Sequence, residues 1–206
     1  MAKNNSEENP LDIKIILLGE TGTGKTNLIN TYYGKDFDPN TQTTTECQFD
    51  IKKLEINNRI CAVNIWDTIG QEQYRAITKS FIRGTDIVIL VYDITRRDTF
   101  LELNYWFDIA SLELGKDVIF GVVGNKNDLY LSSDVTSEEG ENFAQQKDAI
   151  FSLASAKTDP ESFKDLVEKL LEKYLKHKNI IKKEENIIIL NEDEAKKKVT
   201  KKKKFC

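Results

Sequence analysis

The chain has 206 residues, of which 39% are hydrophobic, and a formal net charge of −4. This length suits one compact α/β domain with tails, and no apolar run approaches the ~20 residues of a membrane-spanning helix, so we expect no such helix. The three cysteines show neither disulfide nor metal-ligand spacing, which favours reduced thiols in the cytoplasm.

The chain begins with a polar stretch, residues 1–10, that we expect to be a disordered extension. Residues 13–18 form a β-branched run that predicts a buried strand. The segment Gly19–Thr26 then reads GETGTGKT, which fits the pattern G-x-x-x-x-G-K-[ST] between a strand and a helix that runs to about Tyr33. The sequence therefore predicts a phosphate-binding loop.

Each residue type in this loop suits a phosphate site. Glycines let successive backbone N–H groups turn inward and cradle an anion at the positive end of a helix. Lys25 would reach the β- and γ-phosphates, and the Thr26 hydroxyl would bind Mg²⁺. The motif indicates a nucleoside triphosphate without specifying the base, so a small kinase is an alternative reading.

Two strands, 46–55 and 59–66, are predicted around Asn57-Asn58, a strong hairpin signal. Trp66-Asp67-Thr68-Ile69-Gly70-Gln71 follows. We expect Asp67 to hold Mg²⁺ through water, Gly70 to offer its N–H to a γ-phosphate, and Gln71 to orient the attacking water. One of the threonines at 43–45 would add a hydroxyl to the metal, although the residues alone do not select which.

Further strands are predicted at 87–92, 118–123 and 150–153, and helices at 71–80, 97–113, 136–147 and 160–177. Strands that alternate with helices predict a mostly parallel six-stranded sheet with one antiparallel edge strand and about five helices on its two faces. Together with the phosphate-binding loop, this arrangement predicts the α/β fold of a P-loop nucleoside triphosphatase (NTPase).

Asn125-Lys126-Asn127-Asp128 follows the fifth strand and indicates guanine as the base. The Asp128 carboxylate accepts hydrogen bonds only, and guanine presents two adjacent donors, its N1–H and its N2 amino group, whereas adenine does not. Ser155-Ala156-Lys157, after the last strand, would complete the pocket with a backbone N–H to guanine O6; a plain polar turn is the alternative there.

The tail beyond residue 177 is rich in lysine, glutamate and asparagine. Seven lysines and no acid lie in residues 196–206, so this stretch carries +7 and the rest of the chain −11. A basic tail on an acidic body argues against nucleic-acid binding and favours an anionic membrane surface; a merely solvating tail is the alternative. The aliphatic run 187–190 reads either as a strand-forming patch or as a docking peptide.

The motifs GETGTGKT, WDTIGQE, NKND and SAK resemble, in order and spacing, those of Ras-superfamily small GTPases over roughly residues 11–177, and the segments IWDTIGQEQYRAITKSFIRG and IVILVYDIT resemble the Rab group most. The resemblance implies a monomeric GTP/GDP switch with Mg²⁺. It selects Thr44 as the second metal-binding hydroxyl and Phe37 as the aromatic on guanine, and it implies an effector surface at Phe49, Trp66 and Phe81.

The resemblance also implies partners: effectors that tether or move vesicles, an exchange factor, a GAP that supplies a missing arginine, an escort protein and a dissociation inhibitor. The polybasic run followed by Cys206 resembles a prenylated Rab tail, so we expect the protein to cycle between the cytoplasm and the cytosolic face of an internal membrane. Glu46 and Ile69 depart from the Rab pattern, and Rabs usually end in two cysteines rather than one. A GTP-loaded scaffold with impaired hydrolysis is the alternative function.

The domain boundaries that follow are an extension at 1–10, a G domain at 11–177 and a flexible tail at 178–206. Gln71 is the expected catalytic residue, and Thr26, Thr44 and Asp67 are the expected metal ligands. The residues expected to contact the nucleotide are Glu20, Thr21, Gly22, Thr23, Gly24, Lys25, Thr26, Asn27, Phe37, Thr44, Gly70, Asn125, Lys126, Asp128, Ser155, Ala156 and Lys157.

Overall fold

The computed structural model describes residues 9–41, 48–67 and 81–178, with the backbone alone at 48–50. Six strands form one sheet: β1 (Leu11–Leu18), β2 (Gln48–Ile56), β3 (Arg59–Asp67), β4 (Ile87–Asp93), β5 (Ile119–Asn125) and β6 (Ile150–Leu153). Their order across the sheet is β2-β3-β1-β4-β5-β6, and only the β2–β3 pair is antiparallel. The predicted sheet is confirmed.

The helices of the described residues are α1 (Lys25–Tyr32), α3 (Arg97–Leu101), α4 (Leu103–Leu114), α5 (Ser137–Gln146) and a last helix over residues 160–178. Two 3₁₀ turns, η2 (Gly115–Asp117) and η3 (Asn127–Ser132), border β5. The helix predicted at 71–80 lies outside the described residues. No helix of the described part is both long and apolar enough to cross a membrane.

The strands bury both faces of the sheet. In β1, Ile13, Ile15 and Leu17 join one core cluster, and Ile16 and Leu18 join the other. Because side chains alternate along a strand, a continuous apolar run fills both faces. The same pattern buries every residue of β4 and β5.

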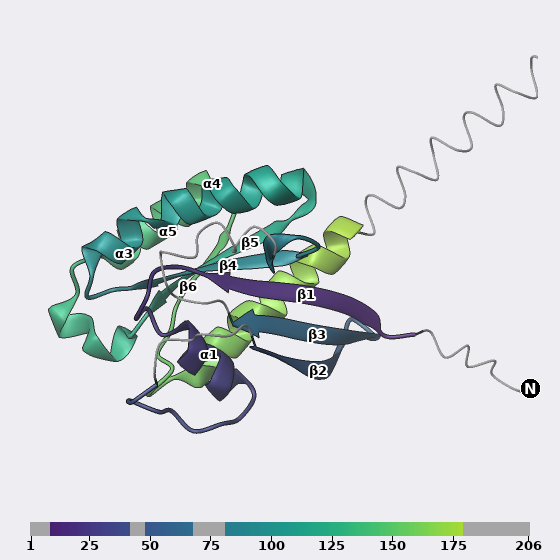
Figure 1. Ribbon diagram of the computed structural model, residues 1–206, viewed down its shortest axis with the longest axis horizontal. Coiled ribbons are helices and arrows are strands. Elements are labelled where there is room, and N and C mark those ends of the chain that lie inside the picture. Colours follow the sequence, from purple (N-terminus) through teal and green to yellow (C-terminus); the bar gives the residue numbers. More distant parts are fainter. Residues whose placement is uncertain (1–8, 42–47, 68–80, 179–206) are drawn as a thin grey trace, which may run out of the picture.

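Helices cover the two faces of the sheet. On one face, Leu28 of α1 and Phe163 of the last helix belong to the core, and on the other, Trp106 of α4 and Phe143 of α5 do. Figure 1 shows α3, α4 and α5 above the strands and α1 below them. The result is a sheet between two helical layers.

The hairpin prediction is confirmed by backbone geometry. Asn57 and Asn58 have φ of 51° and 62°, and positive φ at both central residues is what the two-residue turn matching strand twist requires. Asparagine tolerates this region better than most residues. The turn sets the β2–β3 register, in which Ile56 faces Arg59 and Phe49 faces Trp66.

The single helix predicted at 97–113 is divided in the structure into α3 and α4 at Glu102. The division is slight, because Glu102 N–H still donates to Asp98 O and Trp106 N–H to Glu102 O, both at 3.2 Å. Glu102 itself keeps right-handed helical dihedrals (φ −71°, ψ −10°). Helices α3 and α4 thus form one nearly continuous helix, which begins shortly after the carboxyl end of β4.

Candidate nucleotide-binding site

The loops that carry the predicted site residues leave one edge of the sheet. Strands β1, β3, β4, β5 and β6 are mutually parallel, so their carboxyl ends point the same way. In Figure 1, β1 runs toward the side of the molecule where α1 and α3 lie. Ligands of open α/β sheets bind outside the carboxyl ends of the strands, and the candidate site lies there.

The loop after β1 turns through glycines in left-handed conformations. Gly22 has φ of 79° and Gly24 has φ of 89°, and Thr23 between them is fully buried. Two features exclude a side chain at Gly24. Its φ is positive, and a Cβ there would lie 2.4 Å from Asn125 Nδ2. Glycines of this kind let backbone N–H groups line an anion-binding concavity.

Lys25 begins α1 and is 5% exposed. Its Nζ donates to Gly19 O at 2.7 Å and to Glu20 O at 2.9 Å, which holds the ammonium group inside the loop. Burial lowers the pKa of Lys25 from 10.5 to about 8, and the negative charges of Asp67 and Glu20 oppose that shift. A phosphate anion would supply the buried ammonium with the charge partner that the loop carbonyls do not.

Two of the expected metal ligands are described: Thr26 follows Lys25 in α1, and the charge of Asp67 acts on Lys25. Thr26 is the second residue of α1, and Asp67 ends β3 with 4% of its surface exposed. No group of three or more His, Cys, Asp or Glu side chains in the described residues is arranged to hold a metal ion. One hydroxyl and one carboxylate suit Mg²⁺, which takes few protein ligands and completes its shell with water and nucleotide phosphates. Thr44 lies outside the described residues.

Asn125 joins two of the predicted loops. It ends β5, is 2% exposed, and donates from Nδ2 to Thr23 O at 2.7 Å. Its Oδ1 accepts from Ala156 N–H at 3.4 Å. The phosphate loop, the NKND segment and the SAK turn therefore meet at one buried amide, although Asn125 is 102 residues from Thr23 and 31 from Ala156 in the sequence.

Hydrogen bonds orient the predicted guanine-reading side chains. Asp128 Oδ1 accepts from Ser155 Oγ at 2.6 Å, and that same Oγ accepts from the backbone N–H groups of Lys157 and Thr158 at 3.3 and 3.1 Å. Ser155 thus fixes both the carboxylate and the turn that follows it. One carboxylate oxygen remains available to accept from a base.

Lys126 has a positive φ of 66°, and its Nζ lies 2.6 Å from Oδ2 of the buried Asp93. Asp93 Oδ1 also accepts from the Thr95 N–H and hydroxyl at 2.9 and 2.7 Å. A β4 carboxylate therefore holds the lysine of the NKND segment in place.

Asn27 and Phe37, two further residues predicted to contact the nucleotide, have side chains that already contact other parts of the protein. The Asn27 side chain donates to Asp38 O at 3.0 Å and accepts from Asp38 N–H at 3.2 Å, so this side chain is engaged by Asp38. Phe37 is partly buried and packs against the core cluster that contains α1. Its stacking on guanine stays a prediction.

The structure also shows residues around the loop that the motifs do not contain. Trp106 Nε1–H donates to Glu20 Oε1 at 3.0 Å, with both side chains 6% exposed. Arg96 Nη1 donates to Thr21 O at 3.1 Å. These contacts join positions 86 and 75 residues apart, and no local spacing in the sequence signals them.

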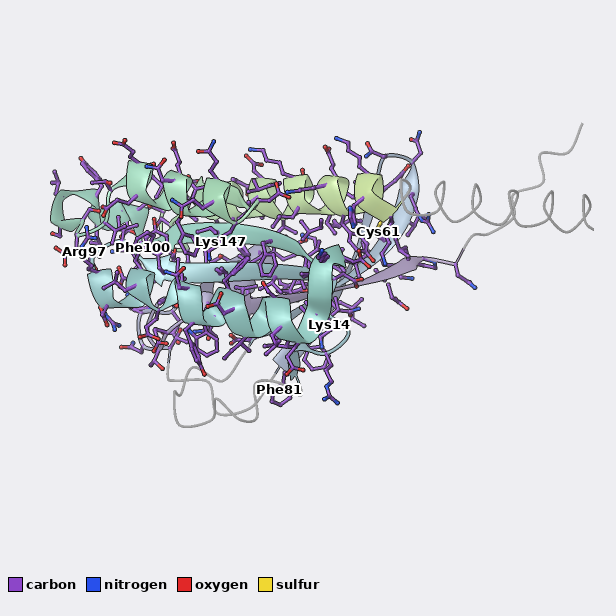
Figure 2. All side chains as sticks on the ribbon, turned by 90° about the horizontal axis from the view of Figure 1, so that it is seen from above. Lys14, Cys61, Phe81, Arg97, Phe100 and Lys147 are labelled. Carbon is purple, nitrogen blue, oxygen red and sulfur yellow. The ribbon has the colours of Figure 1, made fainter. Side chains whose placement is uncertain are left out.

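The predicted effector surface is described in part. Trp66 and Phe81 are half-buried, and the side chain of Phe49 is outside the described set, although its backbone pairs with Trp66. Lys14 Nζ lies 4.8 Å from the Trp66 ring centroid and donates to Phe81 O at 2.5 Å and Arg83 O at 2.9 Å. Figure 2 shows Lys14 and Phe81 at the same side of the molecule. Lys14 thus links the two aromatic positions. Gly70, Gln71 and Cys206 lie outside the described residues.

The fold and the loop geometry define a P-loop nucleotide-binding domain, and comparison with known proteins gives its family. Residues 14–176 match the sequence model of the Ras family. The chain is also 35% identical to "Ras-related protein Rab-2B" of Dictyostelium discoideum over 176 residues, which cover 84% of this chain and 87% of the relative.

The chain therefore belongs to the Ras family, and within it is similar to a Rab. It is a small GTPase: it binds GTP and GDP with Mg²⁺ and hydrolyses GTP. The expectations of family, enzyme class and cofactors are confirmed.

Proposed function

We propose that the loop Gly19–Thr26 holds the β- and γ-phosphates and that Asp128 reads guanine. The buried ammonium of Lys25 and the inward-turning glycines support the first role, and the free oxygen of the oriented Asp128 carboxylate supports the second. Thr26, Asp67 and Thr44 are the proposed Mg²⁺ ligands. The residues that the sequence predicts to contact the nucleotide keep these roles in the proposal, and Asn27 would act through its backbone.

The proposed switch uses the γ-phosphate. Thr44 would bind the metal and Gly70 the phosphate, so both segments would be ordered by GTP and released by GDP. Gln71 would orient the attacking water, and a GAP would supply the arginine that completes charge stabilisation. These three residues lie outside the described ones, and the proposal for them rests on their motifs.

The proposed cellular role is regulation of vesicle traffic. The observation that carries it is the 35% identity to a protein named Rab-2B over most of both chains. The effector-binding surface would be Phe49, Trp66 and Phe81, recognised in the GTP state. Exchange factor, GAP, escort protein and dissociation inhibitor are the further proposed partners.

Membrane attachment is proposed to need two signals, a prenyl group on Cys206 and the lysine-rich stretch 196–206. In this proposal residues 11–177 are the G domain, 178–206 a flexible tail and 1–10 a disordered extension. The protein would act as a monomer that moves between the cytoplasm and the cytosolic face of an internal membrane.

The test compares the chain, tagged at its N-terminus, with Cys206→Ser in eukaryotic cells. The unchanged chain is expected to label one internal membrane, and Cys206→Ser to spread through the cytoplasm because a polybasic tail alone anchors weakly. A variant with Lys201–Lys204 changed to glutamine should lose part of the membrane signal while keeping the lipid. Equal membrane labelling by the unchanged chain and Cys206→Ser would refute lipid anchoring at this residue.

A further inference from the structure

Arg96 occupies the bend between β4 and α3, outside the nucleotide-binding motifs. Its guanidinium donates from Nη1 to Thr21 O at 3.1 Å and from Nη2 to Asp98 Oδ2 at 2.7 Å. Its backbone is fixed too: Arg96 N–H donates to Asp93 O at 3.0 Å, and Arg96 O accepts from the Thr99 hydroxyl at 2.7 Å. The arginine thus connects the end of β4 to the phosphate loop.

The contact at Thr21 O sets the direction of the next N–H group. In a planar trans peptide the C=O and the following N–H point in opposite directions. A Thr21 carbonyl held outward by Arg96 therefore leaves the Gly22 N–H pointing away from the arginine. Gly22 has φ of 79° and, as a glycine, rotates easily, so its peptide needs an external contact to hold one orientation.

Asn125 makes the equivalent contact two peptides further along. Its Nδ2 donates to Thr23 O at 2.7 Å, which turns the Gly24 N–H the other way. Thr21 and Thr23 both precede a left-handed glycine, and both have their carbonyl bound by a side chain from another loop. The guanidinium also packs close to the loop, since a Cβ at Gly22 would lie 3.3 Å from Nη1.

We propose that Arg96 is a positioning residue for the phosphate site: it holds the Thr21–Gly22 peptide so that the Gly22 N–H faces the phosphates beyond the first. It acts through the loop backbone and does not touch the nucleotide. This inference rests on the proposed phosphate-binding role of Gly19–Thr26. The Arg96 side chain is 43% exposed, so the effect is one of a partly screened, charge-assisted hydrogen bond.

The neighbouring Arg97 offers a matched control. It pairs with Glu139 at 2.8 Å and donates to Asp134 O at 2.6 Å, on the side of α5. Figure 2 labels it at one end of the molecule, near Phe100. Arg97→Ala removes the same charge and side chain as Arg96→Ala but leaves the contact at Thr21 O intact.

The experiment measures release of a fluorescent GDP analogue from the full chain with Mg²⁺, and affinity for GMP by calorimetry. Arg96→Ala should release GDP about fivefold faster, the size expected for one such hydrogen bond, and bind GMP unchanged. Arg96→Lys should recover part of the loss, since an ammonium reaches one partner but lacks the planar fork. Arg97→Ala should stay within about twofold of the unchanged chain.

The inference fails if Arg96→Ala releases GDP no faster than Arg97→Ala, or if it weakens GMP as much as GDP. A fourth variant, Lys25→Ala, tests the phosphate site itself. If Lys25→Ala keeps normal GDP affinity, the proposed site is wrong. If it loses GDP while Arg96→Ala behaves like the unchanged chain, the site stands and only the role of Arg96 falls.

Discussion

Asn125 carries more of the site than its place in a four-residue motif indicates. Its Nδ2 donates to Thr23 O and its Oδ1 accepts from Ala156 N–H, so each end of the amide is bonded to a different loop. Buried at 2% exposure, it has no water to replace either bond. The residue therefore couples the phosphate side of the site to the base side.

Asn125→Asp tests this coupling with almost no change of shape. Thr23 O would lose its donor and face a carboxylate. We expect this change to weaken the free energy of GDP binding by about 2 kcal/mol, which is roughly a 30-fold loss of GDP affinity. Asn58→Asp makes the same chemical change in the exposed hairpin turn and should leave affinity as it is. Titration of both variants with GDP measures the difference, and equal affinities would contradict the role of Asn125.

Lys14 lies in β1, and its ammonium group bonds to the segment that precedes β4. Its ammonium holds the carbonyls of Phe81 and Arg83, next to the helical residues 81–82, a place where cations favourably meet helix-end carbonyls. Lys14→Met keeps the aliphatic stem and removes these bonds. We expect it to lower the free energy of unfolding by about 1–2 kcal/mol, measured in urea with GDP bound. Lys53→Met, on exposed β2, should change it by less than about 0.5 kcal/mol.

At the scale of elements, α5 begins with a reciprocal cap. Thr136 Oγ accepts from Glu139 N–H at 3.2 Å, and Glu139 Oε2 accepts from Thr136 N–H at 2.9 Å. The same carboxylate receives two hydrogen bonds from Arg97 of α3. One side chain thus starts a helix and ties it to its neighbour.

These contacts give α5 a pH dependence. The hydrogen bonds from Arg97, then those from Thr136, lower the pKa of Glu139 from 4.5 to about 2. A carboxyl whose pKa is lower when folded contributes stability that is complete above the unfolded value and lost as pH falls from about 4.5 toward 2. The urea midpoint of Glu139→Gln should lie below that of the unchanged chain at pH 7, and the gap should narrow as pH falls below about 4.5 and be nearly closed once pH reaches about 2. Glu141→Gln, on the exposed side of α5, is the charge-matched control; a gap that stays constant with pH would contradict the assignment.

Gly140 shows how packing between elements overrides local preference. It lies inside α5, where glycine costs about 1 kcal/mol relative to alanine. A Cβ there would lie 2.6 Å from the Phe151 ring and 2.6 Å from the Tyr92 hydroxyl. The close approach of α5 to β4 and β6 therefore requires this glycine, and helical periodicity alone gives no reason for it.

At the scale of the molecule, the site belongs to loops from several strands rather than to one element. Residues after β1, at the end of β3, at the end of β5 and after β6 surround it. A bound nucleotide would connect these loops and stabilise only the folded chain.

Removing nucleotide and Mg²⁺ should therefore lower the thermal stability of the whole domain. Restoring GDP to about 1,000 times its dissociation constant should add about 4 kcal/mol, read as a rise in Tm with GDP concentration. ADP at the same concentration should leave Tm unchanged, because adenine lacks the paired donors that Asp128 accepts. A Tm that rises equally with ADP would contradict guanine recognition.

The sequence by itself determined the fold class, the strand positions and the motif residues. Apolar runs of strand length, the Asn57-Asn58 turn and the glycine-lysine loop are local signals, since each depends on residues close together in the chain. The last helix and the phosphate loop were predictable for the same reason.

Only the tertiary structure decided which side chains hold the motifs in place. The bonds from Trp106 to Glu20, from Arg96 to Thr21 and from Asn125 to Thr23 join residues 75 to 102 positions apart. Such contacts form where parallel strands bring their carboxyl ends to one edge of the sheet. A pattern of neighbouring residues does not show which distant residue lies at that edge, because the fold determines the partner.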